Sequence, residues 1–216
     1  LDEALGVSGL PRGKIVEIYG PKNSGKTALC LKVIATCQWE GGVCAYIDLE
    51  QALDLACATR YGVEMTDLYL AQPSSGKEAL EIAKALIKAG IEVVIIDSAT
   101  SLLARAALED NSRHQAIRWR ICLINQALHE LNDLTRLSGT VLIITNHLQL
   151  KPGLNCGRTE FPLRGMALHF YATVRIALSP TQLTESEGCI MRYRVKAMVN
   201  KNKLAPPYRT AVLDIL

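Results

Sequence analysis

The chain has 216 residues and 49% of them are hydrophobic, so it can bury one sizeable core and is too apolar to be intrinsically disordered. Lysine and arginine number 24 against 21 acidic residues, and the net charge of +3 excludes a protein that binds polyanions through its overall charge. Any basic surface must be local. No apolar run approaches the roughly 18–20 residues of a membrane span, and no signal peptide is recognised.

Buried strands are predicted to alternate with helices along the first two thirds of the chain. Strands are expected at Ile15–Tyr19, Val43–Asp48, Leu68–Gln72, Val93–Asp97 and Val141–Thr145, and helices at Lys26–Trp39, Ala52–Tyr61, Lys77–Ala89 and Ala116–Leu137. The last two strands are almost wholly apolar, as is typical of strands covered on both faces of a parallel sheet. The pattern predicts one three-layer α/β domain.

The pattern changes after Gly165. Shorter, mixed strands are expected at Tyr171–Leu178, Met191–Val199 and Arg209–Ile215. We expect them to extend the sheet at one edge, in antiparallel orientation.

Seven cysteines lie mostly in apolar surroundings, and none forms a Cys-x-x-Cys pair. We expect reduced, packed thiols in a cytoplasmic protein, with metal ligands or disulfides as the alternative. They are Cys30, Cys37, Cys44, Cys57, Cys122, Cys156 and Cys189.

The stretch "GPKNSGKT" lies between the first predicted strand and the first long helix. Glycine, four residues and Gly-Lys-Thr in this context predict a loop whose backbone amides hold nucleoside-triphosphate phosphates. Lys26 would reach the β- and γ-phosphates, and the Thr27 hydroxyl would ligate Mg²⁺. The alternative is a glycine turn that matches by chance. The predicted nucleotide contacts are Gly20, Pro21, Lys22, Asn23, Ser24, Gly25, Lys26, Thr27 and Ala28.

Three further strand ends carry polar side chains. Asp97 ends an apolar strand, where a carboxylate needs a positive partner such as Mg²⁺; capping of the next turn is the alternative. Glu50 follows the strand that ends in Asp48 and could orient and deprotonate a water, unless it only caps a helix. His147 follows the strand Val141–Thr145, in "TNH", and could report on the phosphates; a structural histidine is the alternative.

With these sites in order, the chain resembles the RecA family of homologous-recombination ATPases over nearly its whole length. The similar segments are "GLPRGKIVEIYGPKNSGKTALCLKVIA", "YIDLEQALD", "LAQPSSGKEALEI", "VVIIDSATSL", "ALHFYATVR" and "NKNKLAPPY". The phosphate loop alone is common to many nucleotide-binding proteins, whereas the ordered set is specific. The resemblance implies ATP and Mg²⁺ as cofactors, single- and double-stranded DNA as partners, and self-assembly with the nucleotide between subunits.

The resemblance also implies roles for single residues. Lys26, Thr27 and Asp97 would hold phosphates and Mg²⁺, and Glu50 would activate water. Asp54 matches a residue near the adenine, and His147 stands where bacterial RecA has a glutamine that senses the γ-phosphate. Lys201 and Lys203 match a pair that reaches a neighbour's nucleotide, and Phe170 matches an aromatic residue at the subunit interface. The two lysines are expected two residues apart on one strand, so that they would point to the same side; the alternative is a pair of solvated lysines on an edge strand.

Two loops would face DNA, the first around Glu109–Arg120 and the second from Gln149 to Gly165. Six basic residues could contact phosphates, or could form an ordinary charged surface. They are Arg113, Arg118, Arg120, Lys151, Arg158 and Arg164.

The chain departs from the family pattern at several positions. Cys57 replaces the tyrosine that stacks on adenine, Cys156 replaces a loop phenylalanine, Arg164-Gly165 replaces a glycine pair, and Cys122 and His129 fall where DNA-facing arginines are expected. The resemblance implies that residues 1–216 form a single ATPase core, and we expect the family's N-terminal oligomerisation segment and C-terminal domain to be absent from this sequence.

Three hypotheses therefore stand. The first is a DNA-dependent ATPase of recombinase type that forms filaments on single-stranded DNA and exchanges strands. The second is a RecA-like paralogue that assists another repair machine, and the third is a non-catalytic nucleotide-gated module. The intact lysine pair favours the first, the substituted loops favour the second, and Glu50 and Asp97 argue against the third.

Overall fold

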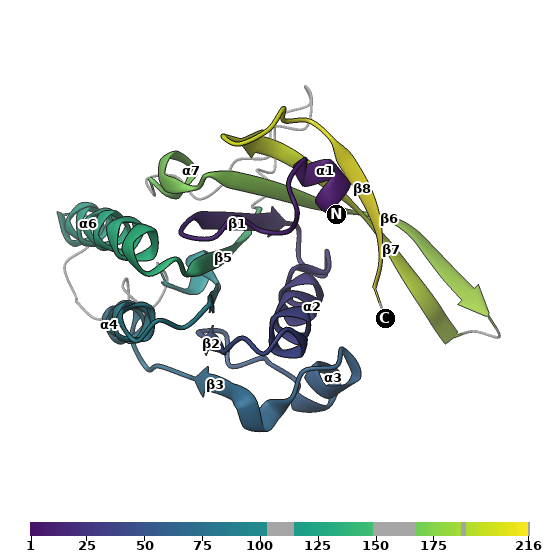
Figure 1. Cartoon of the computed structure of the whole chain (residues 1–216), viewed down its shortest axis with the longest axis horizontal. Helices are drawn as coiled ribbons and strands as arrows, with labels where there is room; N and C mark the ends of the chain where they lie inside the picture. Colours follow the sequence, from purple (N-terminus) through teal and green to yellow (C-terminus); the bar gives the residue numbers. More distant parts are fainter. Residues whose placement is uncertain (103–114, 149–166, 187–188, 216) are drawn as a thin grey trace.

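An eight-stranded sheet organises the chain, in the strand order β3-β2-β4-β5-β1-β6-β7-β8 (Figure 1). The computed structural model describes residues 1–102, 115–148, 167–186 and 189–215. The five strands from β3 to β1, and β6 beside β1, are parallel, whereas β7 and β8 are antiparallel to their neighbours. The strands are β1 Ile15–Gly20, β2 Cys44–Asp48, β3 Leu68–Ala71, β4 Val93–Asp97, β5 Val141–His147, β6 Val174–Ser186, β7 Cys189–Asn202 and β8 Thr210–Ile215.

Helices cover both faces of the sheet. In Figure 1, α2 and α3 lie on one side of the central strands, and α4 and α6 lie on the other. The helices are α1 Asp2–Leu5, α2 Lys26–Trp39, α3 Leu55–Arg60, the 3-10 turn η1 Met65–Asp67, α4 Gly76–Lys88, α6 Gln115–Ser138 and α7 Leu168–Tyr171. In the described part of the chain, no helix is long and apolar enough to cross a membrane.

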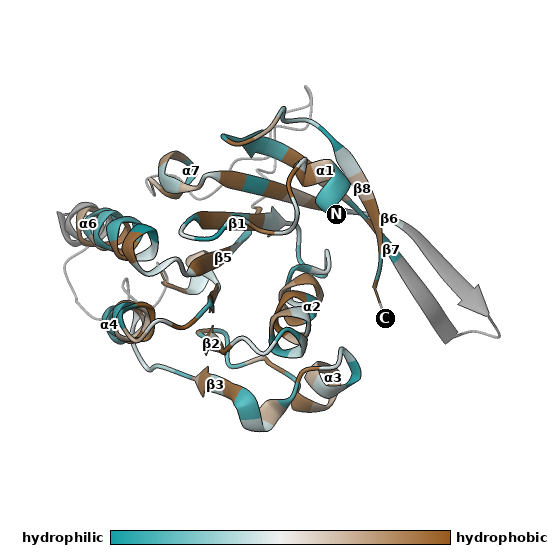
Figure 2. Ribbon diagram, in the orientation of Figure 1, coloured by the Kyte–Doolittle hydropathy of each residue, from teal (hydrophilic) through white to brown (hydrophobic). Residues whose placement is uncertain are grey.

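Two hydrophobic cores explain why the central strands are apolar without alternation. In β4, Val93 and Ile95 belong to the core under α2, while Val94 and Ile96 belong to the core under α4 and α6. Successive strand residues point to opposite faces, and both faces are buried here. Figure 2 shows the result: β5 is mainly brown, whereas the covering helices carry both teal and brown.

The parallel register brings four strand ends to one edge of the sheet. His147 at the end of β5 pairs with Gly20 at the end of β1, and Asp97 of β4 pairs with Asp48 of β2. The chain leaves β1 for α2 and returns in β2, while β4 and β5 lie between these two strands. Such a switch point leaves a crevice outside the carboxyl ends of the strands, where α/β proteins bind ligands.

The three-layer α/β prediction, with a mostly parallel sheet and an antiparallel edge, is confirmed. Several predicted boundaries are wrong. The helix expected at Ala52–Tyr61 begins only at Leu55, because the side chain of Asp54 caps it by accepting from the Ala56 amide at 2.9 Å. Two of the strands expected to be short after Gly165 are long, since β6 and β7 pair continuously through three register irregularities, whereas β8 is short as expected.

Candidate functional site

The loop between β1 and α2 has the backbone shape that its sequence predicts. Asn23 has φ of 59° and Gly25 has φ of 82°. A Cβ atom on Gly20 would meet the carbonyl oxygen of Leu178 and would lie 2.5 Å from Oγ of Ser24, so only glycine fits there. The loop therefore stays tight and leads directly into the N-terminus of α2, where free amides favour an anion.

The loop also contains polar groups that suit a phosphate ligand. The Lys26 side chain is 5% exposed, and its Nζ donates to the carbonyl oxygens of Gly20 at 3.3 Å and Pro21 at 2.8 Å. Burial lowers the pKa of Lys26, against the opposing effect of the Asp97 and Glu50 carboxylates. Within the described residues, Ser24 Oγ is the one buried side-chain polar atom without a hydrogen-bond partner. An acceptor oxygen in the loop would satisfy it, so these residues fit a phosphate.

Asp97 lies where β4 ends, on the face of the sheet that α2 covers. Its Oδ2 accepts from Thr27 Oγ1 at 3.0 Å and from the Tyr46 hydroxyl at 2.5 Å, and its Oδ1 accepts from Thr145 Oγ1 at 2.5 Å. Burial and the Asp97 charge raise the pKa of Tyr46, so the phenol remains a donor. Carboxylate and hydroxyl oxygens are ligands that Mg²⁺ accepts, so Thr27 and Asp97 could hold this ion.

Glu50 is carried by the loop after β2. Asp48 fixes this loop, because its carboxylate accepts from the amides of Ala52 and Leu53 and from Gln72 Nε2 at 3.0 Å. Oε1 of Glu50 accepts from Ser98 Oγ at 2.5 Å and Ser101 Oγ at 3.2 Å, and lies 2.8 Å from His147 Nε2.

Hydrogen bonds outweigh burial in setting the pKa of Glu50. Burial of this carboxyl alone would raise the pKa, whereas the bonds from Ser98 and His147, the His147 charge and the Ser101 bond lower it. The net pKa is below the ordinary value, so the carboxylate is ionised at neutral pH and can accept a proton.

A polar chain runs from His147 across the sheet. The His147 amide donates to Thr100 Oγ1, which donates to Asn146 Oδ1 at 3.3 Å. Asn146 Nδ2 donates to Glu17 Oε1 at 3.0 Å, and Arg175 Nε donates to Glu17 Oε2 at 2.5 Å. Glu17 is 1% exposed in the middle of β1, so these two partners stabilise a carboxylate that would otherwise be costly to bury.

The residues predicted near a base and at a subunit interface lie apart from this cluster. Asp54 caps α3, and Cys57 is half-buried within that helix. Lys201 near the end of β7 donates to the carbonyls of His169 at 2.6 Å and Phe170 at 3.2 Å, and Phe170 is exposed. Burial, Lys203 and Arg175 lower the pKa of Lys201. The prediction that both lysines lie on one strand is wrong, because β7 ends at Asn202 and Lys203 follows in a bend.

Most of the predicted DNA contacts lie outside the described residues. Arg113 falls in residues 103–114, and Lys151, Arg158 and Arg164 fall in residues 149–166. The backbone positions of Arg118 and Arg120 belong to α6, so the end of the first predicted loop is helical instead. Cys122 and His129 follow on the same helix, both exposed.

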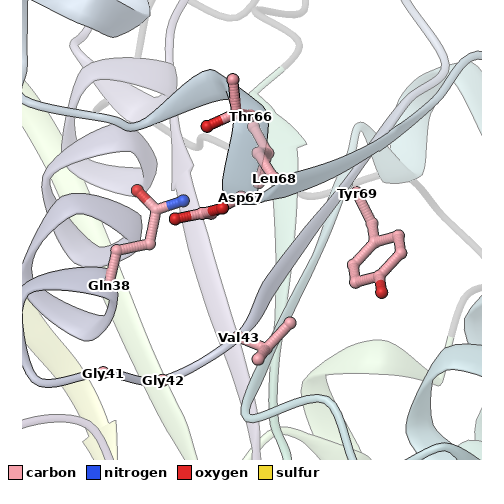
Figure 3. A pocket seen from close by; sticks show the side chains of 8 residues that line it. All are labelled: Gln38, Gly41, Gly42, Val43, Thr66, Asp67, Leu68 and Tyr69. Atoms are coloured by element: carbon pink, nitrogen blue, oxygen red, sulfur yellow. The ribbon is translucent and has the colours of Figure 1, made fainter.

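A separate cavity of about 370 Å³ opens at the opposite edge of the sheet (Figure 3). It lies at the amino ends of β2 and β3, beyond the C-terminal end of α2, and so it is remote from the phosphate loop. Its walls are Gln38, Gly41, Gly42, Val43, Thr66, Asp67, Leu68 and Tyr69.

Sequence reasoning missed the hydroxyl groups that hold the two carboxylates. Ser98 and Ser101 contact Glu50, and Tyr46 and Thr145 contact Asp97. The available signal was position: Tyr46 and Thr145 lie on strands beside β4 and near its end, and Ser98 follows Asp97 directly.

The family model described as the RecA N-terminal domain matches residues 1–216, the whole of this sequence. The chain therefore belongs to the RecA family.

Proposed function

We propose that the protein binds ATP with Mg²⁺ and hydrolyses it in response to DNA. The observation that carries this proposal is the convergence of Lys26, Thr27, Asp97 and Glu50 at one edge of the sheet, with Thr27 hydrogen-bonded to Asp97. A family of nucleotide-dependent recombination proteins is the natural context for this arrangement. Phosphoryl transfer asks mainly for positioning and charge stabilisation, and these residues supply both.

Each residue has a distinct task in the proposed reaction. The backbone amides of residues 20–28 other than Pro21, together with Lys26 Nζ, bind the phosphates, after Lys26 leaves the carbonyls of Gly20 and Pro21. Thr27 and Asp97 hold Mg²⁺, which neutralises charge on the phosphate oxygens. Glu50 accepts the proton of the attacking water, and His147, paired in register with Gly20, donates to the γ-phosphate region. Asp54 contributes to the base site.

The proposal extends to assembly and to DNA. Lys201 and Lys203 of one subunit reach the nucleotide of the next, so the intact nucleotide stabilises the interface and hydrolysis weakens it. Residues of the two predicted DNA loops bind phosphates of single-stranded DNA in the filament, and double-stranded DNA is the second partner in strand exchange. Lys201 donates to the carbonyls of His169 and Phe170 of its own chain, so it would have to leave them to reach the neighbour's nucleotide.

A second candidate function is a RecA-like ATPase that assists another repair machine without exchanging strands itself. Exposed Cys122 and His129 on α6 favour it, since both stand where the family resemblance places DNA-facing arginines. This candidate keeps the hydrolytic site and loses the filament.

Phosphate release, measured with and without single-stranded DNA, tests the proposed activity. The wild-type protein should release phosphate faster with DNA, while Glu50→Gln should bind ATP with unchanged affinity and lose about 10²–10⁴-fold in turnover. Equal turnover of the two proteins would refute the role of Glu50. Electron microscopy with an ATP analogue and DNA then separates the candidates: filaments support the recombinase, and scattered particles support the assisting ATPase.

A further inference from the structure

Three donors converge on one oxygen of the Glu50 carboxylate. Oε1 accepts from Ser98 Oγ at 2.5 Å and from Ser101 Oγ at 3.2 Å, and contacts His147 Nε2 at 2.8 Å. In the part of the chain that the structure describes, no hydrogen bond reaches the other oxygen, Oε2. The carboxylate is therefore held by one oxygen and leaves the second available to a water.

The two serines belong to one rigid turn. Ser98 is fully buried, and its carbonyl accepts from the Leu102 amide at 2.9 Å as a helical turn begins at Ala99. The Ser98 hydroxyl accepts from the Ser101 amide at 3.3 Å and lies 3.3 Å from the Ser101 hydroxyl. The hydroxyl therefore has its acceptor capacity in use and directs its proton to Glu50.

The same turn also places the candidate metal ligand. Ser98 directly follows Asp97, the last residue of β4. The residue that carries one carboxylate of the site is therefore next to the residue that holds the other, Glu50. Glu50 comes from a different loop, 48 residues away in sequence from Ser98. Without the serines, Glu50 would keep only its contact to His147 and could rotate about its side-chain bonds.

We propose that Ser98 and Ser101 are positioning residues for the hydrolysis: they fix Oε1 of Glu50 so that Oε2 takes the proton from the attacking water. This inference rests on the proposed function. In the step, one O–H bond of water breaks, its proton passes to Oε2, and the water oxygen forms its bond to the γ-phosphorus as the bond to the leaving phosphate oxygen breaks. Loss of the serine donors should misorient the carboxylate and lower kcat, with little change in KM.

The charged surroundings of Glu50 make this role measurable. The titratable groups that face it are His147 from β5 and Lys26 from α2. The bonds from Ser98, His147 and Ser101 lower the pKa of Glu50 against the effect of burial, so removing the serine hydroxyls should raise it.

The experiment compares Ser98→Ala, Ser101→Ala and the double variant with the wild-type chain. Ser138→Ala is the matched control, because the Ser138 hydroxyl bonds to Thr140 away from this site. One readout is a ¹³C-carboxyl NMR titration of Glu50, assigned with Glu50→Gln, and the other is kcat and KM for ATP against pH. We expect kcat to fall about tenfold in Ser98→Ala and less in Ser101→Ala, with the Glu50 titration moving to higher pH.

Ser101→Thr serves as a rescue, since it restores a hydroxyl at a partly exposed position. Recovery of the titration and of kcat in this variant supports the inference, and so does a Ser101→Ala effect alone if Ser98→Ala fails to fold. Titrations and kcat values equal to those of Ser138→Ala would overturn it. A wild-type protein that releases no phosphate, while the serine variants still move the Glu50 titration, would refute the proposed function and leave the hydrogen-bonding role of the serines supported.

Discussion

Nε2 of His147 lies 2.8 Å from Oε1 of Glu50, so the end of β5 contacts the carboxylate carried by the loop after β2. Both side chains are partly exposed, and the pair stands beside the phosphate loop because His147 is in register with Gly20. The His147 contact therefore belongs to the surroundings that lower the pKa of Glu50.

The pH dependence of hydrolysis tests this contact. The pKa of Glu50 lies below its ordinary value of 4.5, and an ionised base is needed, so wild-type activity should persist until the pH falls below about that value. His147→Ala removes a donor and a charge, which raises the pKa of Glu50, and activity should be lost at higher pH. Initial rates from about pH 4 to 8 would show this, with circular dichroism checking that both proteins stay folded. Superimposable profiles would contradict it.

Lys26→Ala should abolish ATP binding. Lys26 Nζ is a buried cation that donates to the carbonyls of the loop, so alanine leaves the phosphates without this partner. Lys32→Ala is the matched control, because Lys32 is an exposed lysine of the same helix. Equilibrium binding of a fluorescent ATP analogue measures both. Undiminished binding by folded Lys26→Ala protein would rule out the phosphate-loop assignment.

Lys201→Ala combined with Lys203→Ala should leave ATP binding intact and remove DNA-stimulated hydrolysis. The two lysines would stabilise negative charge on a neighbouring subunit's nucleotide in the transition state. Mixing this double variant with Glu50→Gln should restore part of the activity, because some mixed interfaces pair intact Glu50 with intact lysines. Lys196→Ala, an exposed lysine of β7, is the control.

Assemblies must first be shown to be mixed, for example by co-purification of differently tagged chains. No recovery in such assemblies would argue against a site shared between subunits. A thermal melt is also needed, because alanine at position 201 removes the bonds to the carbonyls of His169 and Phe170 within one chain.

Removing the Glu17 carboxylate should destabilise the fold. Glu17→Leu leaves the positive charge of Arg175 without its carboxylate partner. Breaking a buried pair of this kind lowers the free energy of unfolding by about 3–5 kcal/mol. Changing both residues to leucine should cost less than the single change, because no buried charge remains. Urea unfolding of the two single variants and the double variant measures the difference. Additive losses would show that the two side chains are not coupled.

The position of the candidate site follows from the sequence, because the carboxyl ends of parallel strands meet at one edge of the sheet. Once the strands are placed, Asp97, Glu50 and His147 must lie near the phosphate loop, and the structure brings them together. Local patterns suffice for this step, since a strand end needs only an apolar run and a polar residue after it.

Contacts between distant segments could not be predicted in the same way. Ser98 and Ser101 reach Glu50 across 48 and 51 residues, and a serine after a strand usually signals only a turn. Lys203 is expected on the same strand as Lys201, yet the Asn202 side chain accepts from the Leu204 amide and turns the chain away. The two loops predicted to face DNA carry no periodic pattern from which to place them.

The ion pair of Glu17 and Arg175 also helps to fix the register of β6 against β1. They are directly paired in the register of β1 and β6, with Asn146 on the strand at the other side of β1. Apolar side chains of similar size, such as Val16 and Ile18, can fill one another's positions in the core with little loss of packing energy. Packing alone therefore discriminates weakly between alternative registers of such uniformly apolar strands. If β6 shifted by one residue along β1, the Arg175 guanidinium would point to the face that α2 covers. The Glu17 carboxylate would then be buried on the other face without its partner. The buried pair thus gives the observed register a lower free energy than its alternatives. An otherwise repetitive hydrophobic sheet can therefore place the strand ends of the candidate site in a single arrangement.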